Sequence, residues 1–215
     1  MDYRKLHETS TVDLLSHVYK NYRPRKKISS TSNIYEVERL IWKREKRERF
    51  IEQTEYLVKW TGYSKYESTW ESSDEISPEC IRLFEKPEPE QLQILEAVDS
   101  LRAAVESRLK SNSRLPLTID FPTHIFKYLF EGKGAVIRGW LYLEEADFNR
   151  RLFKKSWDVC LDSFGEGHKI SYPIRLRSFL SWSPKKFVRQ TNGQLQLCSR
   201  AYQERLSFSF ARSPC

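Results

Sequence analysis

Three large aromatic side chains stand close together in the stretch YLVKWTGYSKYESTWE, which spans residues 56–71. Trp60 and Tyr63 flank a Thr-Gly pair, and Trp70 follows shortly afterwards, with Lys59 and Glu71 beside the two tryptophans. The face of an aromatic ring attracts cations and offers a large apolar surface, so such rings bind a positive group or pack in a core. Aromatic residues in strands usually pack. A core therefore explains some of these rings, but it does not require all three.

The chain around these rings has the pattern of short β-strands. Residues 34–42 alternate loosely between apolar and polar side chains, and residues 50–60 resume this alternation up to the turn-like sequence TGYSKYES. The charged run KREKRER at residues 43–49 interrupts the pattern, and TWE at residues 69–71 predicts a third short strand. Three strands this short do not bury a core by themselves, so a further element must cover one face.

A helix that begins after residue 77 supplies this cover. Ser77 is a typical N-cap, and Pro78 suits the first helical position, where its missing N–H is not needed. Helical spacing then allows Cys80, Ile81 and Phe84 to face the sheet.

The order of these motifs closely resembles the chromodomain family over residues 34–87, about a quarter of the chain. The opening Y-x-V-E-x-[IL], the strand and turn Y-L-V-K-W-x-G-Y, and the strand T-W-E occur one after another. The resemblance implies a three-stranded antiparallel sheet packed on a C-terminal helix, and hence an α+β fold. Family members bind methylated lysine in histone tails. The resemblance therefore implies a nuclear chromatin reader or adaptor, associated with heterochromatin and gene silencing.

The chemistry of such a site follows from the ligand. Trimethyl-lysine keeps its positive charge but has no N–H to donate, and each aromatic face around it contributes about 0.5–2 kcal/mol when desolvated. By the family motif, the walls of this cage are Tyr35, Trp60 and Tyr63. Gly62 permits the tight turn that brings Tyr63 back beside Trp60. Trp70 matches the packing tryptophan of the family and is expected in the core.

The family motif also implies how a histone tail is held. The peptide is expected to lie as an added strand between Ile34–Val37 and Ser72–Ile76, with main-chain hydrogen bonds for affinity and small pockets for side-chain choice. Val37 is expected to contact a small residue two before the methyl-lysine, and Glu67 to accept a hydrogen bond from a dimethyl-lysine. The expected peptide-binding residues are Ile34, Glu36, Val37, Glu67, Ser72, Ser73, Asp74 and Glu75.

Some positions depart from the family pattern. Ser72 replaces the proline of T-W-E-P, and Glu75 stands where an asparagine commonly bonds the peptide backbone. The loop between the first two strands is longer than usual and basic, and the opening strand follows a neutral STSNI instead of an acidic run. We expect the missing acidic run to weaken the attraction of a basic histone tail.

Basic residues favour a second hypothesis, in which the protein contacts DNA or RNA. The chain carries a formal charge of +8, and a cluster of lysine and arginine can hold phosphates without sequence preference. The alternative is a solvated hairpin, partly neutralised by Glu45 and Glu48, and a solvated N-terminal cluster that is also compatible with a nuclear import signal. The candidate contacts are Arg23, Arg25, Lys26, Lys27, Lys43, Arg44, Lys46, Arg47 and Arg49.

The remaining segments predict secondary structure but contain no motif that indicates a function. Residues 1–33 predict a flexible basic segment with a possible short helix, and residues 88–112 predict an amphipathic helix that docks on a neighbouring domain. Residues 115–215 predict a β-rich region with a short helix at FPTHIFKYLF and a hairpin at the Asn-Gly of VRQTNGQLQL. The sequence does not indicate which protein this region binds. The apolar stripe of the long helix comprises Ile94, Val98, Leu101 and Val105, widened by Leu95 and Leu109.

Several functional classes find no support in the sequence. The four cysteines lie far apart without the spacing of a zinc site, and His124 and His168 have no partner nearby in sequence, so no metal or cofactor is expected. No glycine-rich phosphate loop or nucleophile elbow indicates an enzyme. Apolar runs are too short to span a bilayer, so no membrane partner is expected. A small chromatin reader without catalytic activity is the best interpretation.

Overall fold

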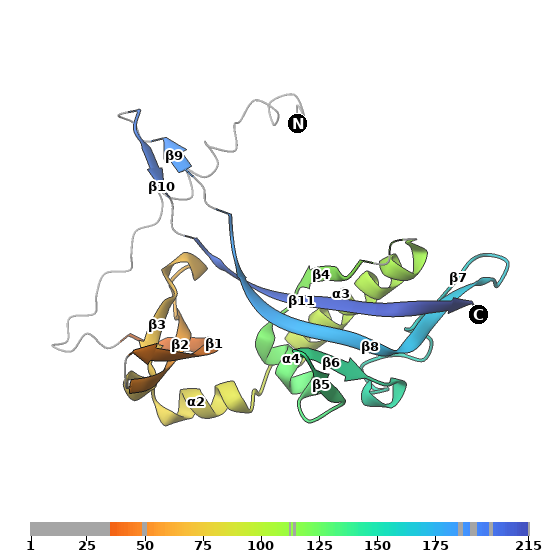
Figure 1. Cartoon of the computed structure of the whole chain (residues 1–215), viewed down its shortest axis with the longest axis horizontal. Helices are drawn as coiled ribbons and strands as arrows, with labels where there is room; N and C mark the ends of the chain where they lie inside the picture. The colour runs from red at the N-terminus through yellow and green to blue at the C-terminus, as the bar shows by residue number, and fades with distance from the viewer. Residues whose placement is uncertain are drawn as a thin grey trace. The chain divides into compact units, whose positions relative to one another are not determined.

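The computed structural model describes residues 35–48, 51–111, 113, 115–184, 187–189, 193–197 and 200–214 (Figure 1). The chain divides into a larger unit, Glu36–Ser183 with Ala201–Cys215, and a smaller unit, Met1–Tyr35 with Pro184–Arg200. The predicted flexible segment and short helix in residues 1–33 lie outside the described residues. Among the described helices, none is both long and apolar enough to cross a membrane.

The first part of the larger unit is a three-stranded antiparallel sheet followed by a helix. Strands β1 (Val37–Glu48), β2 (Ile51–Trp60) and β3 (Thr69–Ser72) pair in the order β1-β2-β3. Two short 3₁₀ helices, η2 (Lys65–Glu67) and η3 (Ser73–Glu75), precede and follow β3, and α2 (Pro78–Glu85) comes next. The Ser77 hydroxyl accepts a hydrogen bond from the Cys80 N–H at 3.3 Å, so the predicted N-cap is confirmed.

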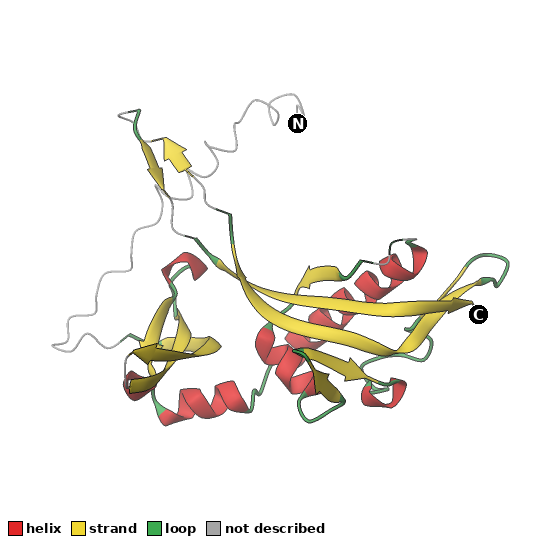
Figure 2. Cartoon of the chain, in the orientation of Figure 1, coloured by secondary structure: helices red, strands yellow, loops and turns green. Residues whose placement is uncertain are grey.

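Residues 43–48 of the charged run continue the first strand, so the predicted interruption is wrong. β1 continues to Glu48 and forms a long hairpin with β2 (Figure 2). Basic residues of β1 lie opposite acidic or polar residues of β2, for example Arg44 opposite Glu55. Opposite charges across two strands stabilise the pair, so a charged sequence can extend a strand that is exposed to water.

Both faces of this sheet are covered. On one face, Cys80, Ile81 and Phe84 of α2 pack against the buried side chains of Leu40, Tyr56, Val58 and Ile76, as the helix pattern predicted. On the other face, Ile41 and Leu57 are fully buried and cluster with Trp70 of β3 and with two residues of the C-terminal strands, Leu180 and Tyr202. Successive residues of a strand point to opposite faces, which explains why the neighbours Leu40 and Ile41 are both buried.

The second part of the larger unit is built on a six-stranded sheet. Its strands pair in the order β4-β11-β8-β6-β5, and β7 pairs with β8. Two long antiparallel strands, β8 and β11, form its centre (Figure 1). The elements are α3 (Gln91–Lys110), β4 (Leu117–Asp120), α4 (Thr123–Phe130), β5 (Ala135–Ile137), β6 (Trp140–Leu143), η4 (Glu145–Asp147), β7 (Val159–Leu161), β8 (Gly167–Trp182) and β11 (Tyr202–Pro214).

Helix α3 belongs to the core of this sheet. The predicted stripe is buried in one cluster with side chains of α4, β6, β8 and β11, which explains the amphipathic pattern. Leu109 lies in the same cluster, but Leu95 is 44% exposed, so its assignment to the stripe is wrong. The predicted β-rich region and the helix at FPTHIFKYLF are confirmed.

The described part of the smaller unit contains a two-stranded antiparallel sheet. β9 (Phe187–Arg189) pairs with β10 (Leu195–Leu197), so the two strands of the predicted hairpin are present. Gly193 has φ +81°, a conformation that glycine adopts without strain. Its predicted turn partner, Asn192, lies outside the described residues.

Candidate functional site

Trp60 and Tyr63 are carried by a tight turn at the end of β2. The Tyr63 N–H donates to the Trp60 carbonyl at 3.2 Å, and Gly62 between them has φ +78°, in the region that favours glycine. The Thr61 N–H donates to the Glu36 carbonyl at 2.9 Å, which attaches the turn to the beginning of β1. The turn therefore has the backbone geometry that the glycine predicted.

The two rings are partly accessible. Trp60 is half-buried, and its indole N–H donates to the Thr69 hydroxyl at 3.0 Å, while that hydroxyl donates to Glu71. The Trp60 side chain also packs against the core beneath α2. Tyr63 is half-buried as well. Tyr35, the third predicted wall, belongs to the smaller unit and is 47% exposed.

Lys59 holds this turn from the side of β2, and sequence reasoning gave it no role. Its ammonium donates to the Trp60 carbonyl at 3.0 Å, the Tyr63 carbonyl at 2.7 Å and the Glu38 carboxylate at 2.6 Å. The Lys59 side chain is only 13% exposed. The signal in the sequence was a lysine between two apolar positions of a strand, which is an unusual place for a solvated cation.

The residues after β3 adopt a capped 3₁₀ turn. The Ser72 hydroxyl accepts from the Gln53 side-chain amide at 2.8 Å and from the Asp74 N–H at 3.3 Å, so Ser72 is the N-cap of η3. This role explains a serine where a proline was expected. Ser73 is half-buried, and the side chains of Asp74 and Glu75 are exposed.

The other predicted peptide-binding residues lie near the turn or at the start of β1. Val37 begins β1 and packs against the core beneath α2, whereas Glu36 is exposed. The Glu67 carboxylate accepts from the Ser64 N–H and hydroxyl, both at 3.0 Å, and so braces the loop that leads to β3. Ile34 lies outside the described residues.

The basic residues of the hairpin that the structure describes are paired with carboxylates. Arg44 donates to Glu55 at 2.7 Å and lies 4.0 Å from the centre of the Trp70 ring, and its hydrogen bond and charge lower the pKa of Glu55. Lys46 lies 3.6 Å from Glu55, and Lys43 lies 3.5 Å from Glu45. These pairings give no specific support to phosphate contacts. The structure does not describe the Arg47 side chain or residues Arg23, Arg25, Lys26, Lys27 and Arg49.

A charged cluster connects the three-stranded sheet to the C-terminal strands. Arg39 of β1 donates to both oxygens of Glu204 in β11, at 3.1 and 2.8 Å, and the Thr123 N–H at the start of α4 donates to the same carboxylate at 3.1 Å. The Glu204 side chain is only 8% exposed. His124 Nδ1 lies 3.4 Å from an Arg39 nitrogen. Burial, and then the charge of Arg39, lower the pKa of His124 to about 4.

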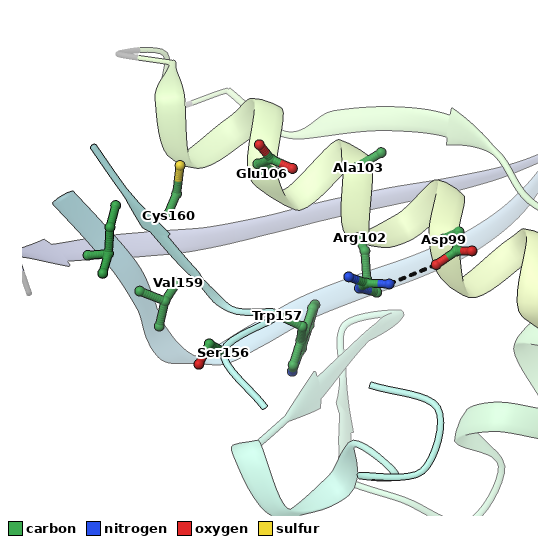
Figure 3. A pocket seen from close by; sticks show the side chains of 9 residues that line it. Asp99, Arg102, Ala103, Glu106, Ser156, Trp157, Val159 and Cys160 are labelled. Atoms are coloured by element: carbon green, nitrogen blue, oxygen red, sulfur yellow. Dashed lines mark hydrogen bonds and ion pairs between the residues drawn. The ribbon is translucent and has the colours of Figure 1, made fainter. Parts of the chain in front are cut away.

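A shallow cleft of about 450 Å³ lies elsewhere, between α3 and the residues around β7. Arg102 and Asp99 form an ion pair of 2.8 Å in it, and Trp157 and Cys160 line the opposite wall (Figure 3). Within the part of the chain that the structure describes, no group of three or more His, Cys, Asp or Glu residues is placed to hold a metal.

The comparison with known families gives one match. Residues 35–87 match the family model of the Chromo (CHRromatin Organisation MOdifier) domain, and the rest of the chain has no family match. No curated protein and no solved structure matched the chain. The matched range covers the three-stranded sheet, the turn with Trp60 and Tyr63, and α2.

Proposed function

Residues 35–87 form a chromodomain, a chromatin-associated binding module, and on this premise we propose that the protein binds methylated lysine in a histone tail. The rings that receive the methylated ammonium group are Trp60, Tyr63 and, by the family motif, Tyr35. The nucleus, heterochromatin and gene silencing are parts of the same proposal. The module itself serves binding and not catalysis.

The observation that carries this proposal is the turn with two half-buried rings. A side chain that only packs is usually covered, whereas a cage wall must leave part of its face open to the ligand. The hydrogen bond from Trp60 to Thr69 fixes the indole before any ligand arrives. A preformed wall loses little conformational entropy on binding, so more of the ring–cation attraction contributes to affinity.

The surroundings of the turn suit a basic peptide. β1 is an edge strand, since the described sheet pairs it only with β2, and an edge strand can accept an extended peptide by main-chain hydrogen bonds. Glu36, Asp74 and Glu75 are exposed, and Glu38 is partly exposed. The carboxylates of Glu36 and Glu38, at the beginning of β1, attract the lysines and arginines of a histone tail, although the acidic run before the first strand is missing.

Calorimetry with matched trimethylated and unmethylated histone peptides tests the proposal on the full chain, after a peptide array has selected the sequence. The parent protein should prefer the trimethylated peptide. Tyr63→Ala and Trp60→Ala should each weaken its binding by about 1–2 kcal/mol, a tenfold effect or somewhat more, without changing the binding of unmethylated peptide.

Tyr66→Ala is a matched control, because Tyr66 is an exposed tyrosine three positions beyond Tyr63. It should leave the affinity unchanged. Circular dichroism checks folding, above all for Trp60→Ala, since Trp60 also packs against the core. A parent protein without preference for any methylated peptide, or a folded Tyr63→Ala variant that keeps the full preference, would show that these rings only pack.

A further inference from the structure

Lys59 makes three contacts that meet at the candidate cage. Its ammonium donates hydrogen bonds to the Trp60 carbonyl at 3.0 Å, the Tyr63 carbonyl at 2.7 Å and the Glu38 carboxylate at 2.6 Å. An ammonium group has three donors, so these contacts use its full capacity. The two carbonyls belong to the residues whose rings form the proposed cage walls, and Glu38 follows Val37, the last residue of the segment expected to pair with the peptide.

These contacts differ from an ordinary surface ion pair. The Lys59 side chain is 13% exposed, whereas that of Glu38 is 45% exposed, so the cation is fixed within the protein and the carboxylate faces water. An exposed ion pair alone contributes little to stability. Bonds from a charged donor to main-chain carbonyls are stronger than neutral ones, and here they set the distance between the two ends of the turn.

We propose that Lys59 is a positioning residue for methyl-lysine recognition, which holds the Trp60–Tyr63 turn closed and ties it to β1. This inference rests on the proposed function for the identity of the ligand. The Lys59 ammonium acts through the backbone carbonyls of the two ring-bearing residues. Lysine suits this role, because its ammonium is compact and sits on a flexible stem. The planar guanidinium of arginine donates in a fixed fork and fits the three acceptors less well.

Lys59→Met is the direct test, because methionine keeps most of the apolar stem and removes all three donors. Trimethylated peptide should bind threefold to tenfold more weakly, and unmethylated peptide should bind as before. Lys59→Arg should recover part of this loss. Lys65→Met is the matched control, since Lys65 is an exposed lysine in the adjacent η2 helix, and it should leave affinity unchanged.

A double-mutant cycle separates positioning from a general loss of structure. If Lys59 acts through the cage, Lys59→Met should weaken binding much less in a Tyr63→Ala background than in the parent, because one wall is already missing. An effect of equal size in both backgrounds would overturn the proposal.

Hydrogen exchange provides a readout that does not depend on the ligand. The Tyr63 N–H donates within the turn, and the Thr61 N–H donates from the turn to the Glu36 carbonyl. Lys59→Met should therefore increase the exchange rates of both amides at least tenfold, while amides of β8 and β11 keep their rates. Unchanged exchange at both amides would overturn the proposal. Faster exchange in a protein that never prefers methylated peptide would uphold the positioning role and overturn the proposed function instead.

Discussion

The ion pair between Arg39 and Glu204 leads to a quantitative prediction about how the chromodomain is held. The Glu204 side chain is 8% exposed and accepts hydrogen bonds from both terminal nitrogens of Arg39 and from the Thr123 N–H. Burial acts against the charge of Arg39, but the hydrogen bond and charge of Glu204 outweigh it, so the pKa of Arg39 is raised. Arg39→Met would leave the carboxylate with one main-chain donor.

The expected cost follows from the burial of the two partners. Removing one member of a buried pair costs about 3–5 kcal/mol, because a charge remains without compensation. The Arg39 side chain is 30% exposed, so water can reach the carboxylate in the variant. We therefore expect a loss of about 2–3 kcal/mol in the free energy of unfolding, which lowers the melting temperature by roughly 4–12 °C in a domain of this size.

Urea unfolding of the full chain, followed by circular dichroism and tryptophan fluorescence, measures this loss. Arg39→Met combined with Glu204→Gln should regain at least half of it, because the glutamine is neutral and still accepts from Thr123. Arg82→Met is the control, since Arg82 pairs with Glu79 on the surface, and its unfolding midpoint should not change. A loss below about 0.5 kcal/mol for Arg39→Met, or no recovery in the double variant, would refute the reasoning.

Two further predictions concern the same region. Trp70→Ala should lower the free energy of unfolding by about 2–4 kcal/mol, below the value for a fully buried ring, because Trp70 is half-buried beside Leu57 and Tyr202; an unchanged thermal melt would contradict this packing. The pKa of His124 is lowered from 6.5 to about 4, so as pH falls through this window the unfolded chain gains a proton that the folded protein does not, and stability decreases. His124→Gln should make this acid-induced loss in the free energy of unfolding smaller by about 1–2 kcal/mol, a value reduced because the imidazole is partly exposed. If urea unfolding shows the same dependence of stability on pH in the variant and the parent, His124 is not the group responsible.

Local patterns predicted the elements well where each residue's partner lies nearby in sequence. The Ser77 N-cap, the α3 stripe and the turn at Gly62 are all settled by spacing within a few residues, and the structure has each of them. The interruption predicted in β1 failed because its stability comes from cross-strand charge pairs such as Arg44 with Glu55, which a single strand's pattern does not reveal.

The site was predictable only in part, for a related reason. The family motif marked Trp60 and Tyr63, and both rings lie on one turn. Neither Lys59 nor Arg39 was marked, because a lysine or arginine in a charged sequence carries no visible partner. Glu204 contacts Arg39 from the other end of the chain, and such a pair becomes apparent only when the fold brings β11 to β1.

The covered second face of the chromodomain has a consequence for synthesis. Ile41 and Leu57 are fully buried beside Leu180 and Tyr202, yet Tyr202 is translated more than a hundred positions after α2 ends at Glu85. At about 5–20 residues per second, the ribosome needs on the order of ten seconds to bridge that gap. During this interval the nascent sheet presents an uncovered apolar face. This face of the sheet is therefore completed only when the last strands of the chain have been made.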